Sequence, residues 1–279
     1  MREIDVRRIE DTIYELFLSA CCEIGEDVLS LLRSNLEMEE SPFGREVLRQ
    51  LIQNDELAAQ RKMPICQDTG MAVIFMNIGQ DVHLVGGDVN LAIESGVRRA
   101  YRDGYFRASV LSPLERINTR DNTPAVVHMR IVPGDRIEIT AAPKGFGSEN
   151  MSRLWMLTPS QGIEGVKDAV VETVRLAGGN PCPPVVVGVG IGGTAECAML
   201  MAKHSLTREC GTPSSEPVLA DMERELLKRI NGLGIGPQGL GGTTTALAVH
   251  IEQMPTHIAG LPVAVNMQCH AARHKSASI

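Results

Sequence analysis

The sequence predicts a mixed α/β protein of the α+β kind, with an N-terminal helical region followed by a sheet-rich region with flanking helices. In residues 1–62, apolar side chains recur at spacings of three and four, which is typical of amphipathic helices. After residue 70, short apolar runs alternate with helical stretches and glycine-rich turns. No internal repeat or low-complexity linker interrupts the chain. We therefore expect one domain over 1–279, with a helical subregion 1–62 and a mixed sheet and helix subregion 63–279.

Helices account for most of the first subregion. Val6, Ile9 and Ile13 begin an apolar stripe that continues to about residue 37. Ser41 followed by Pro42 is a typical helix start, because serine caps free N–H groups and proline suits the first helical position. The pattern then predicts a helix that ends near Arg61.

The second subregion begins with a predicted buried strand at 71–76 and a helix at 88–102. The polar segment 103–124 follows, and a loop of this length inside a domain is usually functional or disordered. The alternating segments 125–131 and 136–141 flank a Pro-Gly-Asp turn, so we expect them to pair as a hairpin. Further patterns predict helices at 161–177, 194–203 and 218–231, and strands at 185–187, 244–251 and 261–266.

Composition excludes several classes of protein. The 279 residues include 34 acidic and 27 basic side chains, with a net charge of −7 and only 3% aromatic residues. A nucleic-acid binder needs a basic surface and often aromatic platforms, so we expect no nucleic-acid partner. No apolar run approaches the roughly 18–20 residues that span a bilayer, and the charged start lacks the apolar stretch of a signal peptide. We expect a cytoplasmic protein with no membrane partner.

A glycine motif offers one alternative function. Gly188, Gly190 and Gly193 satisfy the GxGxxG pattern of dinucleotide-binding folds, which would indicate an NAD-dependent oxidoreductase. That fingerprint also needs a second strand ending in an acidic residue about 20 residues later. The segment 204–210 contains no apolar strand, so we favour the interpretation that these glycines serve close packing.

The seven cysteines fall into two groups. An odd number without a CxxC pair argues against a disulfide framework, a zinc ribbon or a thioredoxin-like site. Three cysteine thiolates can hold an iron–sulfur cluster and leave one iron without a protein ligand. Cysteines as far apart in this sequence as Cys66, Cys182 and Cys269 form no local ligand motif, so their spacing does not identify a cluster. A non-catalytic scaffold with structural cysteines therefore remains an alternative. We expect Cys21, Cys22, Cys197 and Cys210 to fill core space, whereas Cys66, Cys182 and Cys269 lie in predicted loops.

Six sequence blocks together carry a family resemblance over nearly the whole chain. In this order along the sequence, they resemble conserved blocks of the class I, iron–sulfur fumarate hydratases. The chain is most similar to the α subunit of the two-subunit form, in a family shared with L-tartrate dehydratase α. The blocks are Pro64–Gly70, Lys144–Asn150, Ile191–Glu196, Gly234–Gly242, Pro255–His257 and Asn266–His274.

The resemblance implies an iron–sulfur hydro-lyase α-type catalytic domain. It implies reversible hydration of fumarate to (S)-malate, a reaction of the tricarboxylic acid cycle, with L-tartrate dehydration as the alternative that these motifs do not separate. It also implies a β subunit, in an α2β2 assembly, which would supply further substrate-binding residues. The implied ligands of a 4Fe–4S cluster are Cys66, Cys182 and Cys269; the implied catalytic residues are Asp68 and His257; and the implied substrate-binding residues are Gln67, Asp68, Arg107, Lys144, Gly145 and Gly147.

These residue types suit a dicarboxylate substrate. Arginine grips a carboxylate through paired hydrogen bonds, and the backbone N–H groups of 145–147 can form an anion-binding concavity. Asp68 would remove a proton from carbon or orient another base. Each residue also has a simpler interpretation: Asp68 as a turn cap, His257 as a half-buried histidine, and Arg107 as a solvated charge. Cys269 with His270 and His274 would be a zinc site in a further alternative.

The distance from Cys269 to the end of the sequence also favours the two-subunit form. The chain ends ten residues after Cys269, whereas single-chain members of the family continue into a second domain. We therefore expect this chain to be inactive, or nearly so, without its β subunit.

Overall fold

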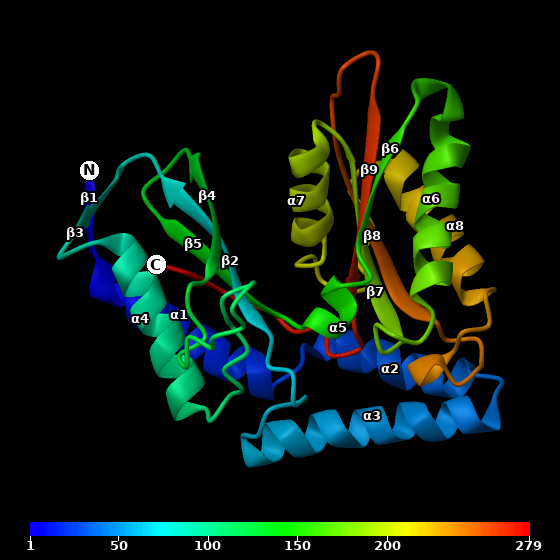
Figure 1. Cartoon of the computed structure of the whole chain (residues 1–279), viewed down its shortest axis with the longest axis horizontal. Coiled ribbons are helices and arrows are strands. Elements are labelled where there is room, and N and C mark those ends of the chain that lie inside the picture. Colours follow the sequence, from blue (N-terminus) through cyan, green and yellow to red (C-terminus); the bar gives the residue numbers. More distant parts are fainter. The chain divides into compact units, whose positions relative to one another are not determined.

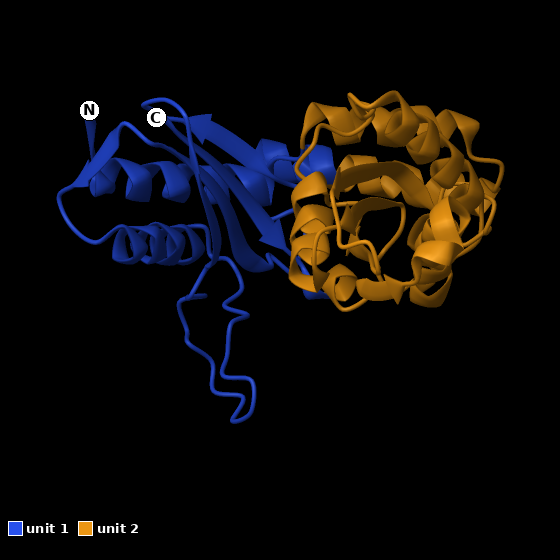
Figure 2. Cartoon of the chain, turned by 90° about the horizontal axis from the view of Figure 1, so that it is seen from above, with its two compact units in different colours: residues 1–24, 55–146, 273–279 blue, residues 25–54, 147–272 orange.

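The computed structural model describes all residues, 1–279, and confirms the mixed α/β class (Figure 1). The chain divides into two compact units, each assembled from segments distant in sequence (Figure 2). Unit 1 contains Met1–Ile24, Asp55–Phe146 and Arg273–Ile279, and unit 2 contains Gly25–Asn54 and Gly147–Ala272. The prediction of one domain with subregions 1–62 and 63–279 stays a prediction.

Unit 1 is built on a four-stranded sheet in the order β10-β5-β2-β4 and a two-stranded sheet of β1 and β3. Helices α1 and α4 pack on each other, and α1 also packs on β5 and β10. Its elements are β1 (Arg2–Asp5), α1 (Val6–Cys22), β2 (Met71–Gly79), β3 (Val82–Val85), α4 (Val89–Asp103), β4 (Val126–Val132), β5 (Ile137–Lys144) and β10 (Lys275–Ser278).

The hairpin predicted for 125–131 and 136–141 is wrong. Both segments are strands, but β2 lies between them, parallel to β4 and antiparallel to β5. The end of β2 passes close to the connection between β4 and β5, where Gly79 N–H donates to the Arg136 carbonyl at 2.8 Å. A Cβ atom on Gly79 would lie 2.4 Å from the Gly134 carbonyl oxygen. The sequence indicated the Pro-Gly-Asp turn, but it did not indicate that β2 lies between the two strands that the turn connects.

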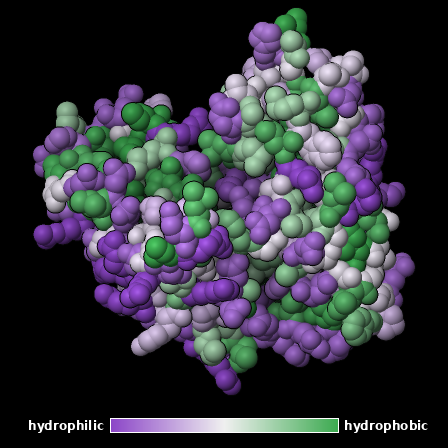
Figure 3. Space-filling view, viewed as in Figure 1, coloured by the Kyte–Doolittle hydropathy of each residue, from purple (hydrophilic) through white to green (hydrophobic).

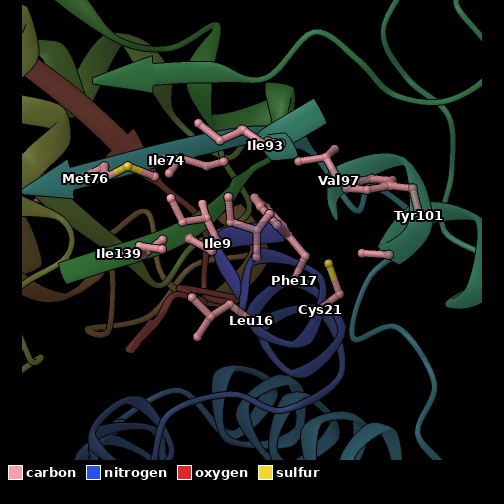
Figure 4. Packing of buried hydrophobic residues seen from close by; sticks show 14 of the residues in the cluster. Ile9, Leu16, Phe17, Cys21, Ile74, Met76, Ile93, Val97, Tyr101 and Ile139 are labelled. Atoms are coloured by element: carbon pink, nitrogen blue, oxygen red, sulfur yellow. The ribbon is translucent and has the colours of Figure 1, made fainter. Parts of the chain in front are cut away.

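The core of unit 1 forms where α1, α4 and the sheet meet (Figure 4). Ile9 and Phe17 of α1 contact this core together with Ile74 of β2 and Ile93 of α4, and all four are at most 1% exposed. Burying an aliphatic or aromatic side chain contributes about 1.5–3 kcal/mol each. The predicted stripe of Val6, Ile9 and Ile13 is therefore the buried face of α1.

Unit 2 is built on a four-stranded sheet in the order β6-β9-β7-β8. In Figure 1, α7 covers one face of this sheet, and α6 and α8 cover the other. Its elements are α2 (Glu26–Met38), β6 (Arg153–Leu157), the short helix η1 (Pro159–Gln161), α6 (Gly162–Ala177), β7 (Val185–Gly192), α7 (Ala195–Ser205), α8 (Pro217–Asn231), the short helix η2 (Pro237–Gly239), β8 (Ala246–Met254) and β9 (Leu261–Gln268).

Two segments cross the boundary between the units. Helix α3 (Pro42–Arg61) has residues in both, and the short helix α5 (Phe146–Glu149) begins at the last residue of unit 1.

The glycine motif in unit 2 serves packing between β7 and α7. Gly188 and Gly190 lie inside β7, and not in the turn that follows it. A Cβ atom on Gly188 would stand 2.0 Å from the Ala202 carbonyl oxygen, and one on Gly190 would stand 2.1 Å from that of Ala198. These two glycines therefore let the helix backbone approach the strand, which supports the packing interpretation over a dinucleotide site.

The surface carries hydrophobic residues among many hydrophilic ones, as the face in Figure 3 shows. The most exposed large hydrophobic side chains include Tyr105, Leu114 and Ile258, each more than 85% exposed and each in a loop. None of the helices is long and apolar enough to cross a membrane.

Candidate functional site

The accessibility of the cysteines fits the predicted roles of six of the seven, and Cys197 is the exception. All seven are free thiols. Cys66, Cys182 and Cys269 are accessible or partly accessible, as ligands of an inserted cluster must be. Of the four predicted to fill core space, Cys21, Cys22 and Cys210 are buried, whereas Cys197 is partly exposed.

Burial makes the core thiols poor ligands. It raises the pKa of Cys21 and of Cys210 to about 12, and it also raises the pKa of Cys22. Since the thiolate is the form that binds metal, the chemistry of the donor set favours the accessible thiols, which are the three predicted ligands and Cys197.

Asp68 is fixed by backbone donors in the loop that carries Cys66. Its Oδ1 accepts from Gly70 N–H at 3.0 Å, which is the predicted turn cap. Its Oδ2 accepts from Phe146 N–H at 2.9 Å. A Cβ atom on Gly145 would approach Oδ2 to 3.2 Å. The carboxylate therefore has a defined direction, and it uses one of the N–H groups predicted to bind the substrate.

Buried polar groups hold the same loop from behind. Tyr101, on α4, donates its hydroxyl to the carbonyls of Thr69 and Gly70 at 2.9 and 3.0 Å. Asn122 donates to the Gly70 carbonyl at 3.1 Å. The Thr69 hydroxyl accepts from the backbone N–H of Arg107 at 3.1 Å. These contacts bring Arg107 beside the loop of Gln67 and Asp68, with the Arg107 side chain exposed to solvent.

Lys144 is a buried lysine at the end of β5. Its side chain is 4% exposed, and Nζ donates to the Gly145 carbonyl at 3.4 Å. Gly70 has a φ of +77°, and a Cβ atom there would lie 2.7 Å from the Lys144 carbonyl carbon. Glycine at position 70 therefore allows the two chain segments to touch. Unit 1 thus gathers Gln67, Asp68, Arg107, Lys144 and Gly145 of the predicted site.

Unit 2 brings two predicted ligands together. The His270 N–H, next to Cys269, donates to the Cys182 carbonyl at 3.3 Å. Cys182 has a φ of +56°, unusual for a residue other than glycine, and lies between the buried prolines Pro181 and Pro183. The loop therefore presents the thiol in a direction set by the backbone.

His257 lies away from the two predicted ligands of unit 2, Cys182 and Cys269. It is exposed in the β8–β9 turn, where its Nδ1 accepts from Ala259 N–H at 3.2 Å. Cys269 follows the opposite end of β9, and eight strand residues span on the order of 25 Å. Within unit 2, His257 is therefore a turn residue remote from Cys182 and Cys269, and its catalytic role stays a prediction.

Gly147 is exposed at the start of unit 2. A Cβ atom there would meet only the Asn180 carbonyl oxygen, at 3.7 Å. Within neither unit do three His, Cys, Asp or Glu side chains form a group that would hold a metal ion. The predicted set takes Cys66 from unit 1 and Cys182 with Cys269 from unit 2, so its assembly stays a prediction.

Arg273 was missed by the sequence reasoning. It is 4% exposed, and its Nη2 donates to the Asp68 backbone carbonyl. Burial raises the pKa of Cys21 and Tyr101, and the charge of Arg273 lowers both. Arg273 therefore adds positive potential next to the Asp68 loop. The only signal in the sequence was its place four residues after Cys269, in a block that was already singled out.

Comparison with known proteins identifies the class to which this fold and these loops belong. The family model described as fumarate hydratase (Fumerase) matches residues 10–278. A protein of Methanocaldococcus jannaschii named "Putative L(+)-tartrate dehydratase subunit alpha" is 42% identical over 274 residues, which cover 95% of each chain. Proteins of Escherichia coli K12 and Shigella boydii, both named L(+)-tartrate dehydratase subunit alpha, are each 30% identical over 272 residues, covering 96% of this chain and 89% of theirs.

The chain therefore belongs to the fumarate hydratase (Fumerase) family of hydro-lyases.

Proposed function

We propose that this chain is the α subunit of an iron–sulfur hydro-lyase that removes water from L(+)-tartrate. The observation that carries the proposal is the 42% identity, along 95% of both chains, to a protein named as a tartrate dehydratase α subunit. The directed carboxylate of Asp68, the buried side chain of Lys144 and the accessible thiols support it, because they suit a dicarboxylate and a cluster.

Cys66, Cys182 and Cys269 would hold a 4Fe–4S cluster. When bound, such a cluster supplies a Lewis-acidic iron that polarises the carbon–oxygen bond of the leaving hydroxyl group. The αL backbone of Cys182 and the main-chain hydrogen bond to His270 keep two of these ligands adjacent without any metal.

Asp68 would accept the proton from the carbon next to the one that loses hydroxide. Its two oxygens each accept one backbone hydrogen bond, so each retains a lone pair for a substrate proton. Arg107 would bind a substrate carboxylate by a forked pair of hydrogen bonds, and Lys144 would add positive charge. Gln67, exposed beside Asp68, would bind substrate hydroxyl or carboxylate oxygens.

Fumarate is the second candidate substrate, because the family model that matches residues 10–278 carries the description fumarate hydratase. In either case, we propose that a β subunit completes the site, in an α2β2 assembly. The relatives named as α subunits support this proposal.

The test is to co-express the chain with a candidate β subunit and purify the complex without oxygen. Iron and sulfide are measured first, and the complex is then assayed with L(+)-tartrate, (S)-malate and fumarate. We expect a complex containing iron and sulfide that forms oxaloacetate from tartrate with a kcat/KM at least about tenfold above its value for malate. The α chain alone should be nearly inactive.

A higher kcat/KM for malate and fumarate would replace tartrate with the second candidate. A folded complex without iron, or full activity of the α chain alone, would overturn the cluster or the β-subunit part of the proposal.

A further inference from the structure

A buried carboxylate in unit 2 has no role in the site described above. Glu39 lies between α2 and α3 and is 0% exposed. Its oxygens accept from Ser41 N–H at 2.9 Å, from Thr243 N–H at 2.9 and 3.1 Å, and from Thr244 N–H at 2.7 Å. Burial alone would raise the pKa of Glu39, but these donors bring it below its ordinary value, so the group stays ionised.

The segment that surrounds Glu39 is the glycine-rich loop 234–244. A Cβ atom on Gly242 would stand 2.6 Å from Glu39 Oε1, and one on Gly236 would stand 2.2 Å from the carbonyl carbon of Gly241. The loop is therefore wound closely on itself and against the carboxylate. Without a buried acceptor, the N–H groups of Thr243 and Thr244 would lack hydrogen bonds, so the conformation of this loop depends on Glu39.

The other side of the same loop holds the segment that carries Cys182. Both the backbone N–H and the side-chain Nε2 of Gln238 donate to the Pro183 carbonyl, at 2.8 and 2.9 Å. A Cβ atom on Gly179 would lie 3.1 Å from the Cα of Gly239. A continuous series of contacts therefore runs from Glu39 through the loop 234–244 to Pro183 and its neighbour, Cys182.

We propose that Glu39 is a positioning residue that, through the loop 234–244, holds Cys182 in the conformation needed to bind the cluster. This inference rests on the proposed function in one respect, the assignment of Cys182 as a cluster ligand. The contacts themselves lie within unit 2 and are independent of any metal.

The first experiment uses the metal-free full chain and hydrogen exchange of individual amides. Glu39→Gln keeps the size of the side chain but replaces one acceptor oxygen with a donor. We expect the amides of Gln238 and His270, which bind the Pro183 and Cys182 carbonyls, to exchange at least about tenfold faster. The matched control is Glu40→Gln, which removes the charge of an exposed neighbour and should change neither amide. A purely local role would speed only the amides of Ser41, Thr243 and Thr244.

The second experiment uses the reconstituted α–β complex and the rate at which a chelator removes iron. Glu39→Gln should lose iron several-fold faster than the wild type and the Glu40→Gln control. Gln238→Ala removes one of the two hydrogen bonds to Pro183, so its effect should have the same direction and be smaller. If Glu39→Gln does not fold, Gln238→Ala still tests the contact between the loop 234–244 and Pro183 on which the proposal depends, and iron loss at the control rate would overturn it.

The outcomes separate the two proposals. If the wild-type complex holds iron and both variants match the control in amide exchange and in iron loss, the role of Glu39 is overturned and the proposed function stands. If the wild-type complex takes up no iron, the cluster assignment fails, and amide exchange still decides whether Glu39 holds the Cys182 segment.

Discussion

The loops that carry the proposed ligands are held by different means in the two units. In unit 1, side chains hold the loop of Cys66: Tyr101 donates to two of its carbonyls, and Asp68 accepts from its own turn. In unit 2, the flanking prolines, a positive φ and the N–H of His270 hold Cys182, and the Gln238 side chain binds the neighbouring Pro183 carbonyl. The unit 1 loop should therefore respond to replacement of side chains that contact it directly, and the unit 2 loop to replacement of side chains that act through the loop 234–244.

The contacts that hold the two loops also determine which groups lie near Cys66 and near Cys182. Side-chain anchoring in unit 1 directs the Asp68 carboxylate in the loop of Cys66 and brings the backbone of Arg107 beside this loop. Beside Cys182, the Pro183 carbonyl accepts from the backbone and the side-chain amide of Gln238, and the Cys182 carbonyl accepts from His270 N–H. We infer that unit 1 supplies most of this chain's catalytic groups and that unit 2 supplies mainly cluster ligands.

The largest expected effect is the difference in the rate of alkylation between accessible and buried thiols. In the metal-free chain at pH 8, iodoacetamide should modify Cys182 at least about 10³-fold faster than Cys21 or Cys210. Burial raises the pKa of Cys21 and Cys210 to about 12, so at pH 8 only about one in 10⁴ molecules carries a thiolate there, and both sulfurs are shielded from the reagent, whereas Cys182 is exposed. Mass spectrometry of peptides measures each site.

In denaturant, the cysteines should react alike, which is the control for intrinsic reactivity. Modification of Cys21 at the rate of Cys182 in the folded chain would contradict the division of the cysteines into ligands and core residues.

The second prediction concerns the side-chain support in unit 1. Asp68→Asn keeps an oxygen for the Gly70 N–H but cannot take a proton from carbon, so kcat of the complex should fall by about 10²–10⁴-fold. Asparagine cannot accept from both the Gly70 and the Phe146 N–H, so the free energy of unfolding should fall by about 1 kcal/mol, whereas the iron content should change little. The matched control is Asp88→Asn in the same unit, where asparagine also caps α4, and its kcat should equal that of the wild type.

An Asp68→Asn complex with full iron content and wild-type kcat would show that Asp68 is a turn residue alone. Catalysis would then have to be assigned to groups of the β subunit.

Sequence patterns correctly predicted those features that depend on residues close together in the sequence. The stripe of α1 and the glycines of β7 were interpreted correctly because their spacing reflects one helix face and one close contact. The place of β2 between β4 and β5 was not predicted, since a Pro-Gly-Asp turn records nothing about a strand inserted from 50 residues upstream. Strands β1, β3 and β10 were missed because four-residue edge strands carry too little periodicity.

The candidate site shows the same limit. The residues near Cys66 were found because they lie in blocks with a family resemblance. Arg273 and Glu39 were missed, because a buried charge is recognised by its partners, and those partners lie about 205 residues away in sequence for both. The remoteness of His257 from Cys269 was equally invisible, since their separation of 12 residues does not reveal an intervening strand.

The third prediction tests the unit 1 anchor directly. Tyr101→Phe removes the hydroxyl that serves two buried carbonyls, so the free energy of unfolding should fall by about 1–3 kcal/mol. The amide of Arg107, which binds Thr69, should exchange faster, whereas the amide of His270 in unit 2 should not change. Tyr105→Phe is the matched control, because Tyr105 is 94% exposed. Equal stability of the two variants would contradict side-chain anchoring.

The smallest expected effect is a pH dependence of the free energy of unfolding, caused by Asp121 in the segment that carries Arg107. Burial alone would raise the pKa of Asp121, but the Arg98 guanidinium at 2.8 Å and the hydroxyl and N–H of Thr123 lower it to about 2. A folded-state pKa below the ordinary 3.8 means that Asp121 stabilises the fold above about pH 4 and that this contribution disappears as the pH falls toward 2.

The free energies of unfolding of the wild type and Asp121→Asn should therefore differ at pH 6 and converge near pH 2. We expect a difference under about 1 kcal/mol at pH 6, because Arg98 and Asp121 are 46% and 28% exposed and solvent screens the pair. A matched control is Asp221→Asn in unit 2, whose pair with Arg224 is 71% exposed on both sides and should contribute almost nothing. A difference for Asp121→Asn that persists unchanged at pH 2 would assign its effect to lost packing, and the charge would then have no part in anchoring the segment of Arg107.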